Sequence, residues 1–372
     1  MNQQLDRESL ARILEAKDIG KLSFSTLLQL FRDEITDFLP DGVCQIDPRD
    51  GFPVLFTSAR ARRPHDNLPE TASEPQTELA CIICQGNTTG VVDVADLSEG
   101  FTFINKNLYP ILYPFEASSA DHSGVQGQAA YGLHFVQWTS SLHNKDWHNM
   151  PPTDCAIVMR RLAALEEKLL TGSQGFPSAE PWGDRPGYHG FVSIIKNYGR
   201  LVGGSLSHGH QQIAFSNILP RRIQNDARFE REREETFSTY MLRENPPDLT
   251  IQDYGPAVLL TPYFMRRPYD MLLLVKDAGK KHLHELDEAE IVAVAEGWRD
   301  AIRAIRALMP AIGRETAYNV VAHNGPGAGL YFEFLPYTQE IGGAEHLGLF
   351  ICQGNPKSVA DRLREYLAKA GR

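Results

Sequence analysis

The residues with the most chemistry to offer lie in one glycine-rich stretch, GGSLSHGHQQ at positions 203–212. Side chains alternate between two faces of an extended chain, so His208, His210 and Gln212 would share one face there. A neutral imidazole whose Nδ1–H is held by a carbonyl presents a bare Nε2 lone pair, which can attack an electrophilic phosphorus. We therefore predict His210 as a nucleophile, with Ser205 and Gln212 as neutral donors to phosphoryl oxygens.

A structural interpretation competes with this one. An isolated H-x-H pair is more often part of a core strand whose two imidazoles have ordinary hydrogen-bond partners. The glycines at 203, 204 and 209 favour the functional interpretation, because the absence of Cβ atoms lets backbone amides approach a phosphate. Further candidate site residues upstream of the stretch also favour the functional interpretation.

Those upstream candidates could hold a phosphate and a nucleoside. Arg60 and Arg63 follow a short predicted strand (54–57), where their guanidinium groups would clamp phosphate or form a solvated basic turn. Asn107 follows a strand that begins at Phe101, and it would contact a base or ribose or be a plain turn asparagine. Asn197 follows a predicted strand (188–195), which delivers it to the mouth of the glycine loop.

A C-x-x-C pair at Cys81 and Cys84 suits half of a tetrahedral zinc site, although it could instead be a redox pair. His143 lies just past a predicted strand (133–138), where a rigid element can position a metal ligand. A single histidine in such a place is more often an ordinary surface or core residue. His148 lies further out in the loop and is a poorer candidate.

Composition limits the classes of function. The chain has 372 residues with 42% hydrophobic and 23% charged content, as in ordinary globular proteins, and a formal charge of −10. This charge argues against nonspecific nucleic-acid binding by the whole surface. Five cysteines, three of them scattered, do not make a disulfide framework. The N-terminus lacks a signal-peptide pattern, and no apolar run of 18 or more residues occurs, so we expect a cytoplasmic protein with no membrane partner.

The predicted elements repeat. Apolar spacing predicts helices over 7–17, 24–38 and 153–170, and a charged helix over 224–244. The second half then gives strands (258–261, 271–275, 317–322, 330–335) and a helix ending at Leu308, in the order seen over 133–219. We therefore predict an α+β fold built from a duplicated unit. In the second unit the H-x-H pair is replaced by Tyr331 and Glu333, so the chemistry belongs to the first.

Another H-x-H pair, His282 and His284, precedes an acidic helix start. We expect both to be surface residues that interact with those carboxylates.

Taken together, the motifs resemble the galactose-1-phosphate uridylyltransferase family within the histidine triad superfamily, from about Val54 to the C-terminus. The matching pieces are R-A-R-R-P (60–64), C-x-x-C-x-G-N (81–87), N-L-Y-P (107–110), G-x-H running on to His143 (132–143), K-N-x-G (196–199) and G-S-x-x-H-x-H-x-Q (204–212). Each is weak to moderate by itself, and their shared order makes the signal strong.

The resemblance implies a duplicated histidine-triad-like unit with antiparallel sheets and flanking helices. Its expected parts are an N-terminal helical segment (1–50), a first domain with the zinc site and catalytic H-x-H-x-Q (51–222), and a degenerate second domain (223–372). It further implies a zinc ion held by Cys81, Cys84, His143 and His208. Relatives commonly pair, so a homodimer is compatible with the resemblance.

The activity implied is transfer of a nucleoside monophosphate between a nucleotide sugar and a sugar 1-phosphate through a covalent nucleotidyl-histidine. UMP is the nucleoside monophosphate that the resemblance favours. His210 would be the nucleophile, Gln212 and Ser205 would hold phosphoryl oxygens, and Asn197 would lie beside them. Arg60 and Arg63 would bind phosphate, with Asn107 near the nucleoside. The alternatives are a phosphorylase acting on a nucleotide sugar or a dinucleoside polyphosphate, and a noncatalytic nucleotide-binding protein.

The chain departs from the family pattern in three places. Gly209 replaces the proline usual between the two histidines, and Ser141 stands where relatives often carry proline before the ligand His143. The second-half H-x-H that helps bind an additional metal in some members is absent, so the resemblance predicts no second metal site. The hexose-contacting residues have no clear match around 348–353, which leaves the sugar open.

Overall fold

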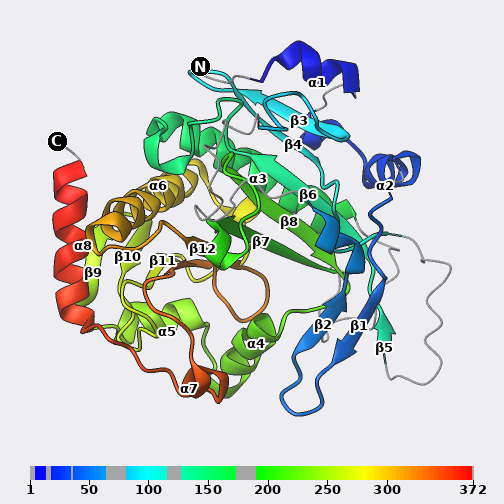
Figure 1. Cartoon of the computed structure of the whole chain (residues 1–372). Coiled ribbons are helices and arrows are strands. Elements are labelled where there is room, and N and C mark those ends of the chain that lie inside the picture. Colours follow the sequence, from blue (N-terminus) through cyan, green and yellow to red (C-terminus); the bar gives the residue numbers. More distant parts are fainter. Residues whose placement is uncertain are drawn as a thin grey trace, which may run out of the picture.

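The computed structural model describes residues 5–13, 18–34, 37–63, 81–114, 127–172 and 190–370 (Figure 1). Three predicted elements lie partly outside these residues: the helices over 7–17 and 24–38, and the strand over 188–195. In the described residues, no helix combines the length and apolar character needed to cross a bilayer.

One antiparallel sheet of ten strands runs through the molecule (Figure 1). The first half contributes β3 (Val91–Asp96), β4 (Phe101–Lys106), β6 (Gly132–Trp138), β7 (Phe191–Tyr198) and β8 (His210–Ser216). The second half contributes β9 (Thr250–Asp253), β10 (Ala257–Leu260), β11 (Met271–Val275), β12 (Tyr318–His323) and β13 (Tyr331–Pro336).

The strand order shows the duplication directly. From the outer edge inward, the first half runs β3-β4-β6-β8-β7 and the second runs β9-β10-β11-β13-β12. The last strand in sequence is second from the middle in both halves, and a long helix precedes the innermost strand in both. The predicted α+β class with a duplicated antiparallel unit is therefore confirmed.

The two halves share the sheet without a break, because β7 pairs with β12. Asn197 lies opposite Asn319, and Tyr198 lies opposite Tyr318 with the two rings stacked at 5.2 Å between centroids. This pairing leaves neither innermost strand with an open edge, which would otherwise expose unpaired backbone groups. The halves are thus joined by backbone hydrogen bonds as well as by side chains.

Two long helices, α3 (Pro152–Gly172) and α6 (Glu288–Ala311), pack against each other and against the sheet. They bury apolar residues such as Leu162, Leu169 and Val294 in one large core. Trp147 and Trp298 meet at the boundary between the halves, with 5.1 Å between ring centroids. The apolar spacing seen in the sequence is therefore the inner stripe of each helix.

The remaining elements lie around this core (Figure 1). A three-stranded sheet in the order β2-β1-β5 consists of β1 (Val43–Ile46), β2 (Pro53–Phe56) and β5 (Gly127–Ala129). The other helices are α1 (Arg7–Ile13), α2 (Phe24–Asp33), α4 (Arg221–Arg233), α5 (Phe237–Glu244), α7 (Gly343–His346) and α8 (Pro356–Ala370), the last packed on α6 and β9.

Two sequence predictions are wrong in detail. The charged helix over 224–244 is two helices, because Glu234 adopts a left-handed conformation (φ 59°) that ends α4. The strand carrying H-x-H begins at His210, so His208 lies in the preceding bend rather than in the strand. His208 and His210 consequently belong to different local structures.

Candidate active site

A hollow opens beside the first residues of β8. It is lined by most of the residues predicted for phosphate and nucleoside contact, namely Arg60, Arg63, Asn107, Ser205, His210 and Gln212. Within the described part of the chain, no Asp or Glu side chain lines it. Two guanidinium groups without carboxylates nearby make a site suited to an anion.

His210 has its ring orientation fixed by backbone. Its Nδ1–H donates to the carbonyl oxygen of His208 at 2.8 Å, which leaves Nε2 with the lone pair. The side chain is buried, with its ring 5.0 Å from that of Trp138. Burial lowers the pKa of His210 to about 4, so the imidazole is neutral at pH 7.

A buried ion pair lies directly beneath this nucleophile candidate. The Lys196 Nζ lies 2.9 Å from Asp146 Oδ2 and donates to the carbonyl oxygen of His210 at 3.1 Å. Both side chains are almost completely buried. Burial would raise the pKa of Asp146, but the neighbouring Lys196 ammonium outweighs it and holds that pKa below its usual value. The pair therefore anchors the start of β8 from below.

The same carboxylate explains the glycine between the histidines. A Cβ atom on Gly209 would lie 2.6 Å from Asp146 Cγ, closer than real side chains approach. A proline or alanine at this position thus requires Asp146 to move. The sequence analysis gave no role to Asp146 and placed Lys196 only in the K-N-x-G piece, because nothing in their spacing indicates that the fold brings them together.

Arg60 and Arg63 are held by carbonyl oxygens at the rim of the hollow. Arg60 Nη1 donates to the Tyr109 carbonyl at 2.6 Å, and Arg63 Nη2 donates to the Gly203 carbonyl at 3.3 Å. Burial, with a contribution from Arg63, lowers the pKa of Arg60 to about 10, so the group stays charged at neutral pH. Arg62 instead lies over the Phe38 ring at 5.1 Å.

The two asparagines behave differently. Asn107 lines the hollow, and its Oδ1 also accepts from the Tyr109 amide at 2.8 Å, so it is both a turn residue and a lining residue. Asn197 is not among the lining residues; its Oδ1 accepts from Asn319 Nδ2 at 2.7 Å. The same Nδ2 donates to the Val202 carbonyl at 3.1 Å, which ties Asn197 to the glycine loop from behind.

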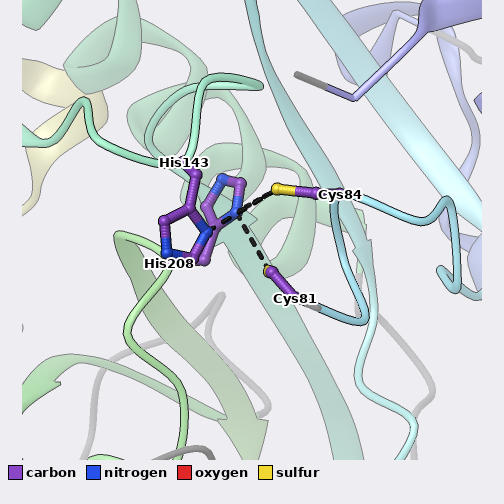
Figure 2. Close-up of side chains that lie close together, drawn as sticks. All are labelled: Cys81, Cys84, His143 and His208. Atoms are coloured by element: carbon purple, nitrogen blue, oxygen red, sulfur yellow. Dashed lines mark hydrogen bonds between the residues drawn. The ribbon is translucent and has the colours of Figure 1, made fainter. Parts of the chain in front are cut away.

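The cysteine pair and two histidines meet in one cluster next to the hollow. Figure 2 shows Cys81 and Cys84 on one loop, facing the rings of His143 and His208. Cys84 Sγ lies 3.5 Å from His208 Nδ1 and 3.6 Å from His143 Nδ1, and Cys81 Sγ lies 3.6 Å from His208 Nδ1. The four donor atoms lie within 4.8 Å of one another.

This donor set fits a tetrahedral zinc ion. His208 Nε2–H donates to the Ser140 carbonyl at 2.7 Å, which turns the bare Nδ1 toward the sulfurs, as metal-binding histidines require. Burial would raise the pKa of Cys81, but hydrogen bonds with His143 and His208 outweigh it and lower that pKa to about 5. Burial and the Cys81 thiolate raise the pKa of Cys84 to about 12.

The serine that replaces proline before His143 has a hydrogen-bonding role. The Ser141 amide donates to the Phe101 carbonyl at 2.7 Å, and its Oγ accepts from the Phe101 amide at 3.2 Å. A proline has no N–H for the first of these bonds. Serine thus lacks the rigid backbone of proline but makes two hydrogen bonds with Phe101, and His143 still lies in the cluster.

Comparisons with known proteins agree with the motifs, although no family model matches the chain. An ADP-glucose phosphorylase of Arabidopsis thaliana is 21% identical over 339 residues, 86% of this chain and 91% of that protein. A galactose-1-phosphate uridylyltransferase of Rattus norvegicus is 25% identical over 255 residues, 63% of this chain and 59% of that protein. The resemblance predicted from the sequence is therefore confirmed.

Solved structures show the same fold. A uridylyltransferase structure is similar with a TM-score of 0.68 and 18% identity, covering 89% of this chain and 100% of that one. An Arabidopsis thaliana ADP-glucose phosphorylase structure with bound ADP-glucose is similar with a TM-score of 0.59 and 19% identity, covering 87% of this chain and 98% of that one. At these identities the likeness concerns the fold.

Proposed function

We propose that this chain is a nucleotidyltransferase that moves a nucleoside monophosphate between a nucleotide sugar and a sugar 1-phosphate through a covalent bond to His210. The observation that carries the proposal is a neutral imidazole with a fixed Nδ1–H, set into a hollow with two guanidinium groups and no carboxylate among its described lining residues. The relatives' names support the substrate class.

In the first step, His210 Nε2 attacks the phosphorus next to the nucleoside. An N–P bond forms, the P–O bond to the second phosphate breaks, and sugar 1-phosphate leaves with the electron pair. The imidazole now carries positive charge, which the His208 carbonyl stabilises through the Nδ1–H bond. A second sugar 1-phosphate then attacks the same phosphorus from solution and releases neutral His210.

The surrounding residues stabilise charge on the phosphoryl oxygens. Ser205 and Gln212 donate to the nonbridging oxygens, and Arg60 and Arg63 offset the charge of the diphosphate. Asn107 contacts the nucleoside. For Asn197 we propose a supporting role through the glycine loop, since its side chain is hydrogen-bonded to Asn319 rather than directed into the hollow.

Zinc at Cys81, Cys84, His143 and His208 would have a structural role, because four protein ligands leave no open position. When bound, the ion would hold the two thiolates and the two imidazoles in one fixed arrangement. The His208 carbonyl is the group that orients His210, so fixing the His208 ring also fixes the nucleophile. The catalytic domain would span 51–222 and the degenerate one 223–372, in a cytoplasmic protein that does not bind nucleic acid.

A phosphorylase is the second candidate, because the relative matching the larger share of this chain is named an ADP-glucose phosphorylase. In that reaction inorganic phosphate replaces the sugar 1-phosphate as the attacking group, and the first step is unchanged. A protein that binds nucleotides without turnover is the remaining alternative.

Intact-mass spectrometry after incubation with UDP-glucose, ADP-glucose or GDP-glucose tests the proposal. We expect a mass increase of one nucleoside monophosphate, which also identifies the base. His210→Ala should abolish the adduct, whereas His346→Ala, a change at an exposed histidine of α7, should retain it. No adduct with any of the nucleotides, or an adduct that persists in His210→Ala, would overturn the covalent mechanism.

Two additions to the adduct separate the enzyme candidates. Release of nucleotide sugar by hexose 1-phosphate supports the transferase, and release of nucleoside diphosphate by inorganic phosphate supports the phosphorylase.

A separate experiment tests the metal site. Cys84→Ser should lower the zinc content and the melting temperature, whereas Cys352→Ser should change neither. An unchanged zinc content in Cys84→Ser would refute the assignment of the ligands.

A further inference from the structure

A second group of metal-binding side chains lies where α3 meets the 3-10 helix Leu283–Glu285. Glu166 of α3 faces His282 and His284, and one donor atom from each residue lies within 4.8 Å of the others. Among the described residues, this group and the cysteine cluster are the two sets of three or more such side chains that converge in this way.

The two histidines are not the surface residues that the sequence predicted. His282 is 6% exposed and Glu166 is fully buried, because α3 and the 3-10 helix pack together between the two halves. The imidazoles are stacked, with 5.3 Å between centroids and 23° between planes. Their Nδ1 atoms consequently face the same carboxylate.

The separations suit an ion between the donors. His284 Nδ1 lies 2.9 Å from Glu166 Oε2, and His282 Nδ1 lies 3.7 Å from Glu166 Oε1. A metal about 2.1 Å from each donor holds donors roughly 3.0 Å apart at a right angle and roughly 3.4 Å apart at a tetrahedral angle. The distance of 2.9 Å matches the right-angle value, the distance of 3.7 Å is slightly longer than the tetrahedral value, and all three donor atoms lie within 4.8 Å of one another. An ion would therefore have to draw His282 toward the carboxylate.

Outer hydrogen bonds already orient the carboxylate. Asn324 Nδ2 donates to Glu166 Oε1 at 2.6 Å, and the His284 amide donates to Oε2 at 3.0 Å. Such partners hold metal-binding carboxylates in place in known sites. Glu166, a residue of the first half, is therefore preorganised by hydrogen bonds from the second half.

A neighbouring acid and histidine cluster lacks this convergence. His323 Nδ1 bonds to Asp226 Oδ2 at 2.7 Å, and its Nε2 bonds to Glu333 Oε2 at 3.0 Å. The carboxylates occupy opposite edges of one ring, so their oxygens and the ring nitrogens cannot share one ion. Glu333 stands at the second-half counterpart of the catalytic H-x-H, where no metal was predicted. The convergent donors lie elsewhere, at Glu166.

We propose that Glu166, His282 and His284 bind a divalent transition-metal ion of the zinc or ferrous class, as imidazole and carboxylate donors favour. The ion would join α3 of the first half to the 3-10 helix of the second. It shares no residue with the hollow or with the cysteine cluster, so its role is structural.

Metal analysis of the intact chain tests this proposal. Protein is stripped with a chelator, reloaded with excess Zn²⁺, desalted and measured by elemental mass spectrometry beside Glu166→Gln and a control, Glu167→Gln, which alters the exposed neighbour on α3. We expect Glu166→Gln to hold one zinc fewer than the wild type, and Glu167→Gln to match it. Equal metal content in Glu166→Gln and the wild type would overturn the proposal.

Cobalt spectroscopy of the wild type keeps the test decisive if Glu166→Gln does not fold. Co²⁺ bound to thiolates gives strong ligand-to-metal charge transfer, whereas two imidazoles and a carboxylate give only weaker d–d bands. We expect a second equivalent of Co²⁺ to add d–d intensity without further charge transfer. Saturation of all bands at one equivalent would show that Glu166 and His284 form an ion pair without a metal.

Discussion

At the scale of single residues, the chemistry proposed for His210 depends on how closely the backbone around it is packed. The His208 carbonyl fixes the ring, the Lys196 ammonium holds the His210 carbonyl, and Asp146 fills the space beside Gly209. A neutral nucleophile can react only when its lone pair points at the phosphorus. A misoriented imidazole would therefore lower the rate of adduct formation without weakening nucleotide binding.

Gly209→Ala tests this packing. The new Cβ would lie 2.6 Å from Asp146 Cγ, and shifting this buried carboxylate disturbs Lys196 and the His210 carbonyl that Lys196 holds. We expect a loss of about 1–3 kcal/mol in the free energy of unfolding. The rate of adduct formation should fall at least about tenfold, with nucleotide affinity changed much less.

Gly343→Ala is the matched control, because a Cβ there meets nothing within 4 Å. It should leave stability and adduct formation unchanged, as measured by chemical denaturation and time-resolved mass spectrometry. If Gly209→Ala behaved like this control, Asp146 would not constrain the loop.

How far the sequence predicted the site depends on whether the residues carry their own signal. His208, His210 and Gln212 could be predicted because a glycine-flanked H-x-H-x-Q has few other uses. The full set of four candidate metal ligands came from the resemblance, since a single C-x-x-C does not indicate which histidines join it. Asp146 and Lys196 could not be predicted, because their pairing depends on a tertiary contact between segments 50 residues apart.

At the scale of elements, long apolar patterns were the predictable part. The run over 271–275 became β11, and the spacing up to Leu308 became most of α6. Short strands such as β1, β5 and β9 carry too few residues for a period to be visible. The break between α4 and α5 was missed because the residues around Glu234 are good helix formers, and tertiary packing overrides that preference.

The residue just before β11 carries a pH-dependent penalty. Asp270 is 6% exposed, and its Oδ1 has no hydrogen-bond partner among the described residues. Burial raises the pKa of Asp270 to about 7 from 3.8. The folded state therefore favours the protonated form, and stability is lost as the pH rises from the unfolded pKa to the folded one.

Asp270→Asn removes this titration while retaining an acceptor for the Arg267 amide. We expect the stability gain over the wild type to be about 2.5 kcal/mol larger at pH 8 than at pH 5. Chemical denaturation at the two pH values measures it. Asp277→Asn, in an exposed turn, should give no such difference. A gain that was the same at both pH values would show that Asp270 does not titrate in this range.

At the scale of the whole molecule, the duplicated halves form one structure rather than two independent domains. The β7–β12 pairing makes one sheet, α3 packs on α6, and Asn319 of the second half supports the glycine loop of the first. The second half lacks the H-x-H pair of the first and still contacts the candidate site through Asn319. A duplicated sequence predicts two similar units, but it does not reveal that their innermost strands pair.

This continuity predicts that damage to one half destabilises both. Val294 is fully buried in α6, and Val294→Ala should cost about 2 kcal/mol. If the halves unfold together, amide hydrogen exchange should accelerate by the same free energy in β8 of the first half and in β13 of the second. Mass spectrometry of peptides from these strands measures both exchange rates.

Thermal unfolding gives a second test of the coupling. When it is followed by circular dichroism and by tryptophan fluorescence, both signals should show one coincident transition. Exchange that accelerates only in β13, or two separate thermal transitions, would mean that the shared sheet does not couple the halves. The second half would then support the candidate active site only through local contacts such as that of Asn319 with Asn197.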